Sequence, residues 1–506
     1  MKKSIFVIVL FAFAVVGLSP EATKPARSAG GPQAPPTFSK EVVRIFQQNC
    51  QSCHHPNYIA PFSLMTYEEA KPYAFPIKSA VQERRMPPWK AAAGCGNFHD
   101  ERILTQDEIS TLVRWVEAGA PEGDPKDLPA PISFPDGWML GEPDIALQSA
   151  EAYPLAATGD DVYRCFPVSD SFQQEQYVTA AEILPDNTSV VHHVLLFLDS
   201  KGESVKLDAA EPGPGYTCFG GPGFIPAGGL GGWAPGNFPR FAPKGVGAKV
   251  PKGSRVVMQV HYHPNGEAQQ DRTRVGLHFA KEPVQSDLRN FPIFNFAFLI
   301  PPGKSNHKVT AQMMVPPGIN IKVLGITPHM HLLGKSMKIE ATLPNGNKRC
   351  LVNVDNWDFK WQGSYAYKDP VSLPGGTRLK LTAFYDNSVN NPNNPNNPPK
   401  PVYWGEQTTD EMCLAFVNYI IDRKTSSVTA AAPNIDELDG AVGAPRIKMG
   451  SIDMLERARI RMQSSLFSSA PVEMYNWSEG FSRNDLNILP WRKASPDNPR
   501  SRHSCH

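Results

Sequence analysis

Val190-Val191-His192-His193-Val194-Leu195-Leu196-Phe197 is a run of β-branched, apolar and aromatic residues that carries two adjacent histidines. Runs of this length and composition are typical of strands. Comparable runs recur between turns rich in glycine and proline, of which the 506-residue chain has 39 and 50. The predicted strands include residues 177–183, 190–198, 254–263, 321–326 and 414–421. Beyond Pro129 we therefore expect antiparallel β-sandwiches.

The histidines are unevenly distributed in this β region. Six of the 13 fall in three tight pairs, namely His192-His193, His261-Tyr262-His263 and His329-Met330-His331. Side chains at i and i+2 of a strand point to the same face, so His329 and His331 can chelate one metal ion. Adjacent strand residues point in opposite directions, so His192 and His193 can share an ion only at a strand end or a bulge. Imidazole suits copper and zinc, and an added thioether, here Met412, favours a copper that cycles through Cu(I).

A different motif, Cys50-Gln51-Ser52-Cys53-His54, lies near the N-terminus. Two thiols three residues apart on one helical turn can each add to a vinyl group of a porphyrin, and the following histidine then ligates the iron. A zinc site would need a second pair of ligands nearby, and the next cysteine, Cys95, stands alone. A thioredoxin-like site would need a βαβ context, which this segment lacks. The motif therefore predicts one covalently bound haem c.

A small helical domain is expected around the haem motif. Residues 37–48 carry apolar residues at helical spacing, with Ser39 at the N-cap, and residues 105–118 are expected to form a closing amphipathic helix. Met86, in a proline-rich loop, is the predicted sixth iron ligand, and Met65 and His99 compete with it for that role. The segment 37–122 resembles a small class I-like cytochrome c domain.

The order of the motifs over residues 137–422 is more specific than any one of them. The stretches concerned are Asp161-Val162-Tyr163-Arg164-Cys165, the run from Val190 to Phe197, Pro243-Lys244-Gly245-Val246-Gly247, Met258-Gln259-Val260-His261-Tyr262, His329-Met330-His331-Leu332-Leu333-Gly334-Lys335 and Asp410-Glu411-Met412-Cys413. In kind and order they resemble the copper type II, ascorbate-dependent monooxygenases, the family of peptidylglycine α-hydroxylating monooxygenase and dopamine β-monooxygenase.

This resemblance implies two jelly-roll-like β-sandwich domains, each holding one copper ion across a solvent cleft. It implies that His192, His193 and His261 hold an electron-storing copper. It also implies that His329, His331 and Met412 hold the copper that binds dioxygen. His263 has no counterpart ligand in the family, and Gln259 falls where the family has a glutamine near the first copper, which predicts a supporting role.

The resemblance also bears on the cysteines. Those outside the haem motif fit an exported protein, and the resemblance implies a disulfide between Cys165 and Cys218. Ala383 stands where the family has a partner for the cysteine after the methionine ligand. Cys413 is therefore expected either to pair with Cys350 or to stay reduced.

Departures from the family bear on the substrate. Its peptide-amidating members grip a substrate carboxylate with an arginine just before the HxH pair and with a tyrosine and an asparagine after the methionine. The corresponding stretches here, Ile326-Thr327-Pro328 and Leu414-Ala415-Phe416, offer no cationic clamp. An uncharged or apolar small organic substrate is therefore expected.

The N-terminus predicts export. Lys2 and Lys3 precede an apolar run at residues 5–16, which small residues follow, as in a signal peptide. The run is too short to span a bilayer comfortably, so the mature protein is expected to be periplasmic or secreted and not membrane-spanning. The formal net charge of +1 gives no electrostatic footprint for nucleic acid.

These observations predict a multidomain chain, with a small all-α cytochrome c domain followed by two antiparallel β-sandwich domains. The expected boundaries are a signal peptide at 1–22, the cytochrome domain at 37–122, a proline-rich linker at 123–138, two sandwiches at 139–288 and 289–432, and a C-terminal extension without an assigned role at 433–506.

The predicted function is that of a copper-dependent monooxygenase with two copper ions and one haem c. Monooxygenation consumes O2 and two electrons, which two one-electron copper centres can store. The haem would pass on electrons from an external donor, such as a periplasmic redox protein, a quinol-linked chain or an ascorbate-like reductant. Two alternatives stay open. One is a non-catalytic electron-transfer or copper-binding protein with the same ligands, and the other is an interaction module in which only the haem works.

Overall fold

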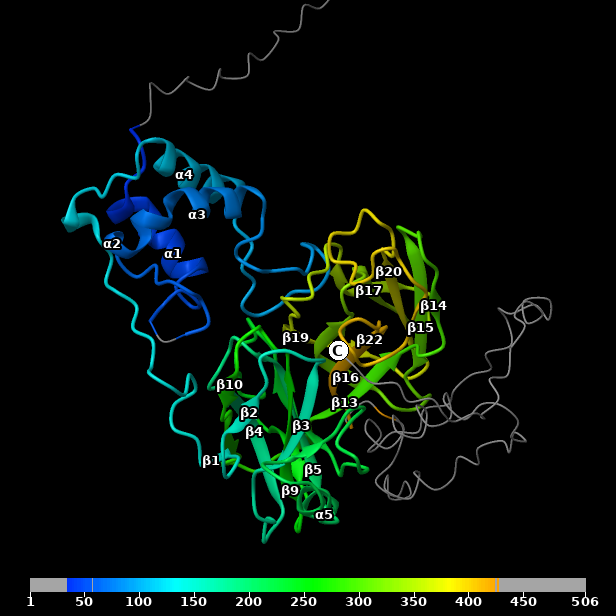
Figure 1. The fold of residues 1–506 in the computed structure, drawn as a ribbon. Coiled ribbons are helices and arrows are strands. Elements are labelled where there is room, and N and C mark those ends of the chain that lie inside the picture. Colours follow the sequence, from blue (N-terminus) through cyan, green and yellow to red (C-terminus); the bar gives the residue numbers. More distant parts are fainter. Residues whose placement is uncertain (1–33, 57, 424–425, 427–506) are drawn as a thin grey trace, which may run out of the picture.

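The computed structural model describes residues 34–56, 58–423 and 426 (Figure 1). The expected signal peptide at 1–22 and the C-terminal extension at 433–506 lie outside the described residues. Within the described ranges, no helix has the length and apolar character that crossing a membrane requires. Most of the regular structure is β, with a group of helices near the N-terminus.

The helices between residues 38 and 117 gather at one end of the molecule, coloured blue in Figure 1. They are η1 (Phe38–Val42), α1 (Val43–Asn49), α2 (Tyr67–Ala70), η2 (Lys71–Tyr73), α3 (Ala74–Gln82) and α4 (Gln106–Glu117). The two predicted helices are thereby confirmed, although Thr37, not Ser39, is the N-cap of the first, because Ser39 is buried inside its opening turn. A short turn, η3 (Pro125–Asp127), opens the expected linker.

Helix α4 begins at a capping box. The Thr105 hydroxyl accepts a hydrogen bond from the Glu108 backbone N–H at 3.2 Å, and the Glu108 carboxylate accepts one from the Thr105 N–H at 2.7 Å. The apolar face of α4 buries Leu112 and Trp115 against Phe38 and Phe46 of the first helix, which closes a small core.

Residues 145–287 form two five-stranded sheets that share one apolar core. One sheet has the order β1 (Ile145–Gln148), β11 (Arg274–Phe279), β4 (Gln176–Leu184), β8 (Val246–Val250) and β12 (Ser286–Asp287). The other has the order β6 (Tyr216–Thr217), β3 (Val162–Pro167), β9 (Arg255–Tyr262), β5 (Val191–Asp199) and β7 (Gly229–Trp233). A short ribbon of β2 (Tyr153–Leu155) and β10 (Gln269–Asp271) and the helix α5 (Glu203–Ala210) complete this region, which we call the first sheet pair.

Residues 289–421 form a second sheet pair around a separate core. One sheet has the order β13 (Arg289–Phe294), β22 (Leu414–Ile421), β16 (Ile321–His329) and β19 (Tyr365–Leu373). The other has the order β15 (His307–Met314), β20 (Arg378–Tyr385), β17 (Gly334–Thr342) and β18 (Lys348–Val354), and β14 (Leu299–Ile300) pairs with β21 (Val402–Tyr403). All five strands predicted from sequence are present. Apart from the parallel β8–β12 pair, the strands of the packed sheets pair antiparallel, which is compatible with the expected sandwiches.

One segment of the expected cytochrome domain leaves the helices. Residues 88–102, which we call the strap, cross to the second sheet pair, where Ala91 pairs with Val354 and Phe98 with Tyr367. Ala91 and Phe98 are buried in the core of that sheet pair, and a disulfide joins Cys95 to Cys350. Cys95 has no neighbouring cysteine in the sequence, and its disulfide partner lies 255 residues away.

Candidate metal centre

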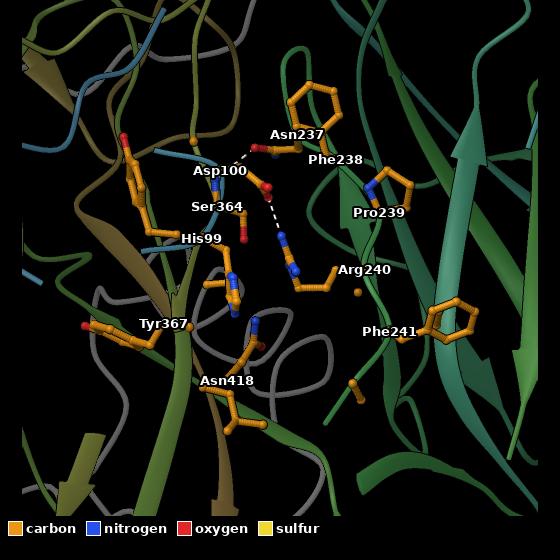
Figure 2. A pocket seen from close by; sticks show the side chains of 18 of the residues that line it. His99, Asp100, Asn237, Phe238, Pro239, Arg240, Phe241, Ser364, Tyr367 and Asn418 are labelled. Carbon is orange, nitrogen blue, oxygen red and sulfur yellow. Dashed lines mark hydrogen bonds and ion pairs between the residues drawn. The ribbon is translucent and has the colours of Figure 1, made fainter. Parts of the chain in front are cut away.

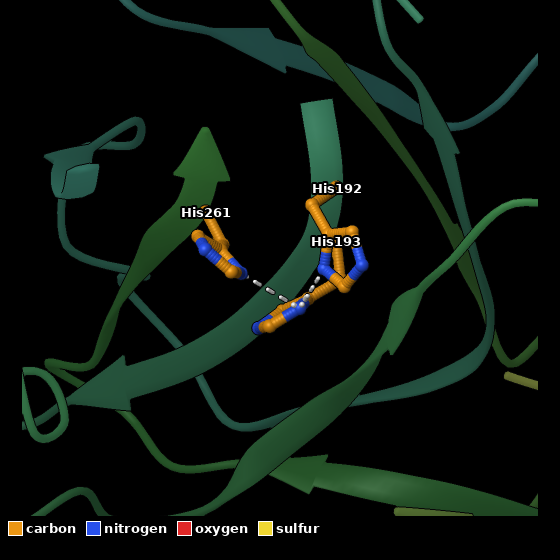
Figure 3. A group of neighbouring side chains, drawn as sticks. All are labelled: His192, His193 and His261. Atoms are coloured by element: carbon orange, nitrogen blue, oxygen red, sulfur yellow. Dashed lines mark hydrogen bonds between the residues drawn. The ribbon is translucent and has the colours of Figure 1, made fainter. Parts of the chain in front are cut away.

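His192, His193 and His261 lie together on neighbouring strands of the first sheet pair (Figure 3). His193 stands opposite His261 in the β5–β9 ladder, and the register shifts between Val191 and His193, so His192 is the extra residue of a bulge. The bulge lets the two adjacent histidines turn to the same side. Adjacent strand residues can share a metal ion only at such a bulge or at a strand end, as the sequence analysis expected.

The geometry of these three imidazoles fits a metal ion. His193 Nδ1 lies 3.2 Å from His192 Nδ1 and 3.3 Å from His261 Nδ1. One ligand atom from each residue lies within 4.8 Å of the other two. Three electron-rich nitrogens that converge in this way form an arrangement that a bound cation stabilises, and neutral imidazole nitrogens are ligands that copper accepts.

Asp161 lies on the outer side of this cluster. Its Oδ2 is 3.3 Å from His261 Nε2, and its Oδ1 is 2.7 Å from Nδ1 of the exposed His263. The carboxylate thus faces Nε2 of His261 and leaves Nδ1 toward the other two histidines. Tyr163 stacks on the His261 ring at 4.1 Å, which fixes the ring plane further. His263 therefore lies beside the cluster without joining it, as expected.

His329 and His331 lie at the end of β16 and just beyond it, in the second sheet pair. His329 Nδ1 is 2.6 Å from the Gln362 side-chain oxygen, and His331 Nδ1 is 3.1 Å from the Asp410 carbonyl oxygen. Both Nδ1 atoms therefore donate to an acceptor, which leaves Nε2 of each ring available to bind a metal ion. The ring centroids of the two histidines lie 5.1 Å apart.

Strand pairing brings the segment that carries Met412 beside His329. His329 pairs with Leu414 in the β16–β22 ladder, and Met412 precedes Leu414 by two residues. The buried Glu411 carboxyl group joins the two chain segments, because it accepts hydrogen bonds from the backbone N–H of His331 at 2.9 Å and of Met412 at 3.1 Å. A third bond comes from the Leu333 N–H at 2.6 Å. Glu411 thus holds the HxH turn against the segment that carries the methionine.

The two histidine sets are contiguous. The ring centroids of His193 and His329 lie 6.4 Å apart. Phe359 fills the space beside them, since it stacks on His192 at 4.5 Å and lies 5.9 Å from the His331 ring. The resemblance implied two sites facing each other across a solvent cleft, whereas this structure brings the sites together.

All five histidines of the two sets are neutral at ordinary pH. Burial lowers the pKa of His192 to about 3 and that of His329 to about 4. Burial also lowers the pKa values of His193, His261 and His331, although Asp161 opposes this change at His261. Neutral imidazole is the form that binds a metal ion, so the cluster needs no deprotonation first.

The remaining sequence-based expectations have mixed outcomes. The Cys165–Cys218 disulfide is confirmed. Cys413 is buried and reduced, because Cys350 pairs with the strap. Gln259 points at the disulfide, where its amide donates to the Cys218 carbonyl oxygen at 3.0 Å, and not at the histidines.

The Cys50–His54 motif ends α1 and forms a tight turn. The backbone N–H groups of Cys53 and His54 donate to the Cys50 carbonyl oxygen at 3.0 and 2.9 Å, and both thiols are outside any disulfide. His54 Nδ1 lies 3.0 Å from the Phe62 carbonyl oxygen, so Nε2 is its available ligand atom. Two reduced thiols and an imidazole with one oriented nitrogen fit the attachment and proximal ligation of a haem.

The three candidates for the sixth haem ligand lie in different surroundings. Met86 is half-buried after α3, and its N–H donates to the Ala80 carbonyl oxygen at 3.2 Å. Met65 is half-buried just before α2. His99 lies on the strap, where its N–H donates to the Ala366 carbonyl oxygen at 2.8 Å. The choice of Met86 stays a prediction.

Sequence reasoning missed several residues that orient the histidines. Asp161 and Glu411 fall inside the motif stretches and could have been weighed there as hydrogen-bond partners. Gln362 and Phe359 carry no sequence signal, because they come from the connection between β18 and β19, far from any histidine along the chain.

Comparisons with known proteins point to one family. Residues 297–435 match the sequence model of the C-terminal domain of copper type II ascorbate-dependent monooxygenases. MOXD1 homolog 1 of Drosophila melanogaster is 21% identical over 187 residues, which cover 34% of this chain. That match spans only 26% of the fly protein, about a quarter of its length.

The solved structures that match this chain resemble it only weakly. One is PNGF-II, at 10% identity, with 55% of this chain and 65% of that chain covered and a TM-score of 0.24. Another is infectious bursal disease virus, Gt strain, at 10% identity, with 63% and 87% covered and a TM-score of 0.15. Scores this low establish no common fold.

Proposed function

We propose that this chain is an exported copper-dependent monooxygenase that hydroxylates a C–H bond of an uncharged or apolar small organic substrate with O2. The family match at residues 297–435 supports copper monooxygenase chemistry at the level of the family. The observation that carries the proposal to this chain is the orientation of its imidazoles. One set turns three Nδ1 atoms inward, and the other keeps two Nε2 atoms available.

The proposed ligand sets follow from this orientation. His192, His193 and His261 would hold one copper ion through Nδ1, and His329 and His331 would hold a second through Nε2, with the Met412 thioether as its third ligand. Copper, when bound, supplies the one-electron redox chemistry that activation of O2 requires. The reaction takes up O2, two electrons and two protons, and it yields the hydroxylated product and water. Gln362, Asp410 and Glu411 orient the second set from outside.

We propose that electrons enter through a covalently bound haem c. Cys50 and Cys53 would form its thioether bonds, His54 would be the proximal ligand and Met86 the sixth. The haem would lie in a cytochrome domain of residues 37–122, with 123–138 as a linker and sandwiches at 139–288 and 289–432. The donor would be a periplasmic redox protein, a quinol-linked chain or an ascorbate-like reductant. The two disulfides indicate an oxidising compartment, which supports the proposed export.

The substrate class rests on the residues beside His329. The β16–β22 ladder sets Pro328 opposite Ala415 and Thr327 opposite Phe416, immediately before the His329–Leu414 pair. None of these side chains is charged, so nothing among them would compensate an ionised group on the substrate. An uncharged or apolar C–H donor is the class that such a surface accommodates.

Metal and haem content of the mature protein tests the proposal. The chain would be produced in a host that matures c-type cytochromes, and copper would be measured by mass spectrometry and haem as the pyridine haemochrome. We expect two copper ions and one haem per chain. His193→Ala and His331→Ala should each lose one copper ion and retain the haem, whereas the control His263→Ala should retain all three.

Each outcome separates the proposal from its alternatives. Haem without copper, even after copper loading, would contradict a monooxygenase. A full complement of metals in a protein that never couples O2 uptake to oxidation of an organic compound would favour the non-catalytic electron-transfer protein. Unchanged copper content in His331→Ala would exclude the second ligand set.

A further inference from the structure

The residues proposed to bind copper lie on two different sheet pairs. The first sheet pair carries the first set, which we define as His192, His193 and His261. The second sheet pair carries the second set, which we define as His329, His331 and Met412. The two sheet pairs meet beside both sets, and hydrogen bonds that cross this junction end on residues that orient the imidazoles.

Asp161, which faces His261, is held by a residue of the other sheet pair. Thr408 belongs to the segment 404–411, which leads directly into Met412. Its backbone N–H donates to Asp161 Oδ2 at 3.1 Å, and its hydroxyl donates to the same oxygen. That oxygen lies 3.3 Å from His261 Nε2, and both side chains are buried. The direction in which the carboxylate faces His261 therefore depends on Thr408.

The segment 404–411 forms a closed loop against the first sheet pair. Its ends are joined, since the Gly405 N–H donates to the Glu411 carbonyl oxygen at 3.2 Å. The Tyr163 hydroxyl donates to the Glu406 carbonyl oxygen at 2.7 Å, and the Tyr163 ring stacks on an imidazole of the first set. This loop of the second sheet pair is thus bound on both sides of that imidazole.

The second set is held in the same way from the opposite direction. Asn237, on the first sheet pair, lies in the wall of a cavity of about 510 Å³ at the junction (Figure 2). Its side-chain oxygen accepts a hydrogen bond from the Ser364 N–H at 2.9 Å, and its side-chain nitrogen donates to the Gln362 carbonyl oxygen at 3.3 Å. The Gln362 side-chain oxygen lies 2.6 Å from His329 Nδ1. Asn237 therefore fixes the backbone of the residue that orients His329.

A third contact across the junction lacks this connection. Arg240 of the first sheet pair forms an ion pair with Asp100 of the strap at 2.6 Å, as Figure 2 shows. Both side chains are exposed, and within the described part of the chain neither bonds to a residue that orients an imidazole. This ion pair provides a control, because its loss loosens the junction without releasing a histidine.

We infer that Thr408 and Asn237 are positioning residues, each of which acts on the copper set of the opposite sheet pair. The inference rests on the proposed function, because it concerns the two copper ions of that proposal. Thr408 acts through Asp161, and Asn237 acts through Gln362, on one imidazole of the set. Each copper set is therefore fully oriented only where the two sheet pairs are joined.

The test measures the copper affinity of one set at a time by competition with a chelator. His331→Ala keeps the first set complete, and His193→Ala keeps the second. In these two parents we expect Thr408→Val to weaken copper binding at the first set, and Asn237→Ala to weaken it at the second, by about 10- to 100-fold each. Thr408→Ser, which keeps the hydroxyl, should bind copper as its parent does.

Electron paramagnetic resonance of bound Cu(II) separates a change of orientation from a loss of stability. The copper hyperfine splitting should change at the first set in Thr408→Val and at the second set in Asn237→Ala, because it depends on how the imidazoles are oriented. Two controls should change neither the affinity nor the splitting. They are Thr409→Val, at the exposed neighbour on the same loop, and Arg240→Gln, which removes the third contact.

The outcomes separate this inference from the proposed function. Unchanged affinity and splitting in either Thr408→Val or Asn237→Ala would overturn the inference, while copper content still supported the function. Equal losses in Arg240→Gln would overturn it as well, since they would show a general loosening of the junction. If one variant does not fold, the other decides from the opposite side. A wild-type protein that binds no copper would contradict the proposed function and this inference together.

Discussion

The atom that each histidine offers is set by what its other nitrogen touches. Asp161 faces Nε2 of His261, whereas Gln362 and the Asp410 carbonyl group accept from Nδ1 of His329 and His331. Such partners orient a ligand and raise its basicity, so they influence metal affinity without contacting the ion.

Asp161 gives a prediction about copper affinity. We expect Asp161→Asn to weaken copper binding at the His192, His193 and His261 set by about 10- to 100-fold, because it removes the carboxylate that orients His261. Competition with a copper chelator measures this change. His263→Ala, which loses the other imidazole beside the same carboxylate, should bind copper normally. Equal losses in both variants would show that Asp161 does not act through His261.

The buried imidazoles predict that the copper-free protein loses stability in mild acid. An unfolded histidine titrates near pH 6.5, whereas burial lowers the folded pKa to about 3 for His192 and to about 4 for His329. Between these limits the unfolded chain binds more protons than the folded one, so the free energy of unfolding falls as the pH falls.

Glu411 acts in the opposite sense. Burial raises its pKa to about 8, so the folded chain binds the extra proton between that pH and the ordinary carboxyl range near 4.3. Burial also raises the pKa values of Glu182, Asp208 and Asp410. The five buried imidazoles outnumber these four carboxyl groups, and we expect the thermal midpoint of the copper-free protein to drop between pH 6.5 and pH 4.5. Scanning calorimetry at constant ionic strength measures it, and a flat or rising midpoint over that interval would contradict the buried neutral state.

Regular elements began and ended largely where local signals predicted. The strand β22 has the predicted bounds, and α4 starts at its capping threonine. The sequence could not predict the bulge in β5, because a bulge depends on how the strand pairs with its partner β9.

The capping box of α4 supports a test confined to one helix. Thr105→Ala should destabilise α4 by about 1 kcal/mol, because it removes the acceptor for the Glu108 N–H. Hydrogen exchange of the α4 amides, followed by mass spectrometry, localises the effect. Ser110→Ala, on the exposed face of the same helix, should leave these amides protected; equal loss in both variants would refute the capping role.

The whole molecule is held together by the strap as well as by the linker. The strap runs from the helices near the N-terminus to the second sheet pair. The Cys95–Cys350 disulfide joins it to that sheet pair. This crosslink restricts how far the Cys50–His54 motif can move from the histidines, which the proposed electron transfer would require.

Loss of the crosslink should loosen this arrangement. We expect Cys350→Ser to lower the free energy of unfolding by about 2–4 kcal/mol, because a crosslink across a long loop restricts the unfolded chain. Denaturation in guanidinium chloride measures the loss, and limited proteolysis should then cut the strap. Cys95→Ser should behave identically, whereas Cys218→Ser should leave the strap resistant. A resistant strap in Cys350→Ser would show that packing of Ala91 and Phe98 suffices.

The sequence by itself determined the helices, the principal strands, the Cys50–His54 motif and the identity of the clustered histidines. These follow from spacing and side-chain chemistry within a few residues. Only the tertiary structure decided that Cys95 pairs with Cys350, that Asp161 and Gln362 orient the imidazoles, and that His193 lies near His329. Those contacts join residues far apart in the chain, and they depend on how packed sheets meet, which local patterns do not encode.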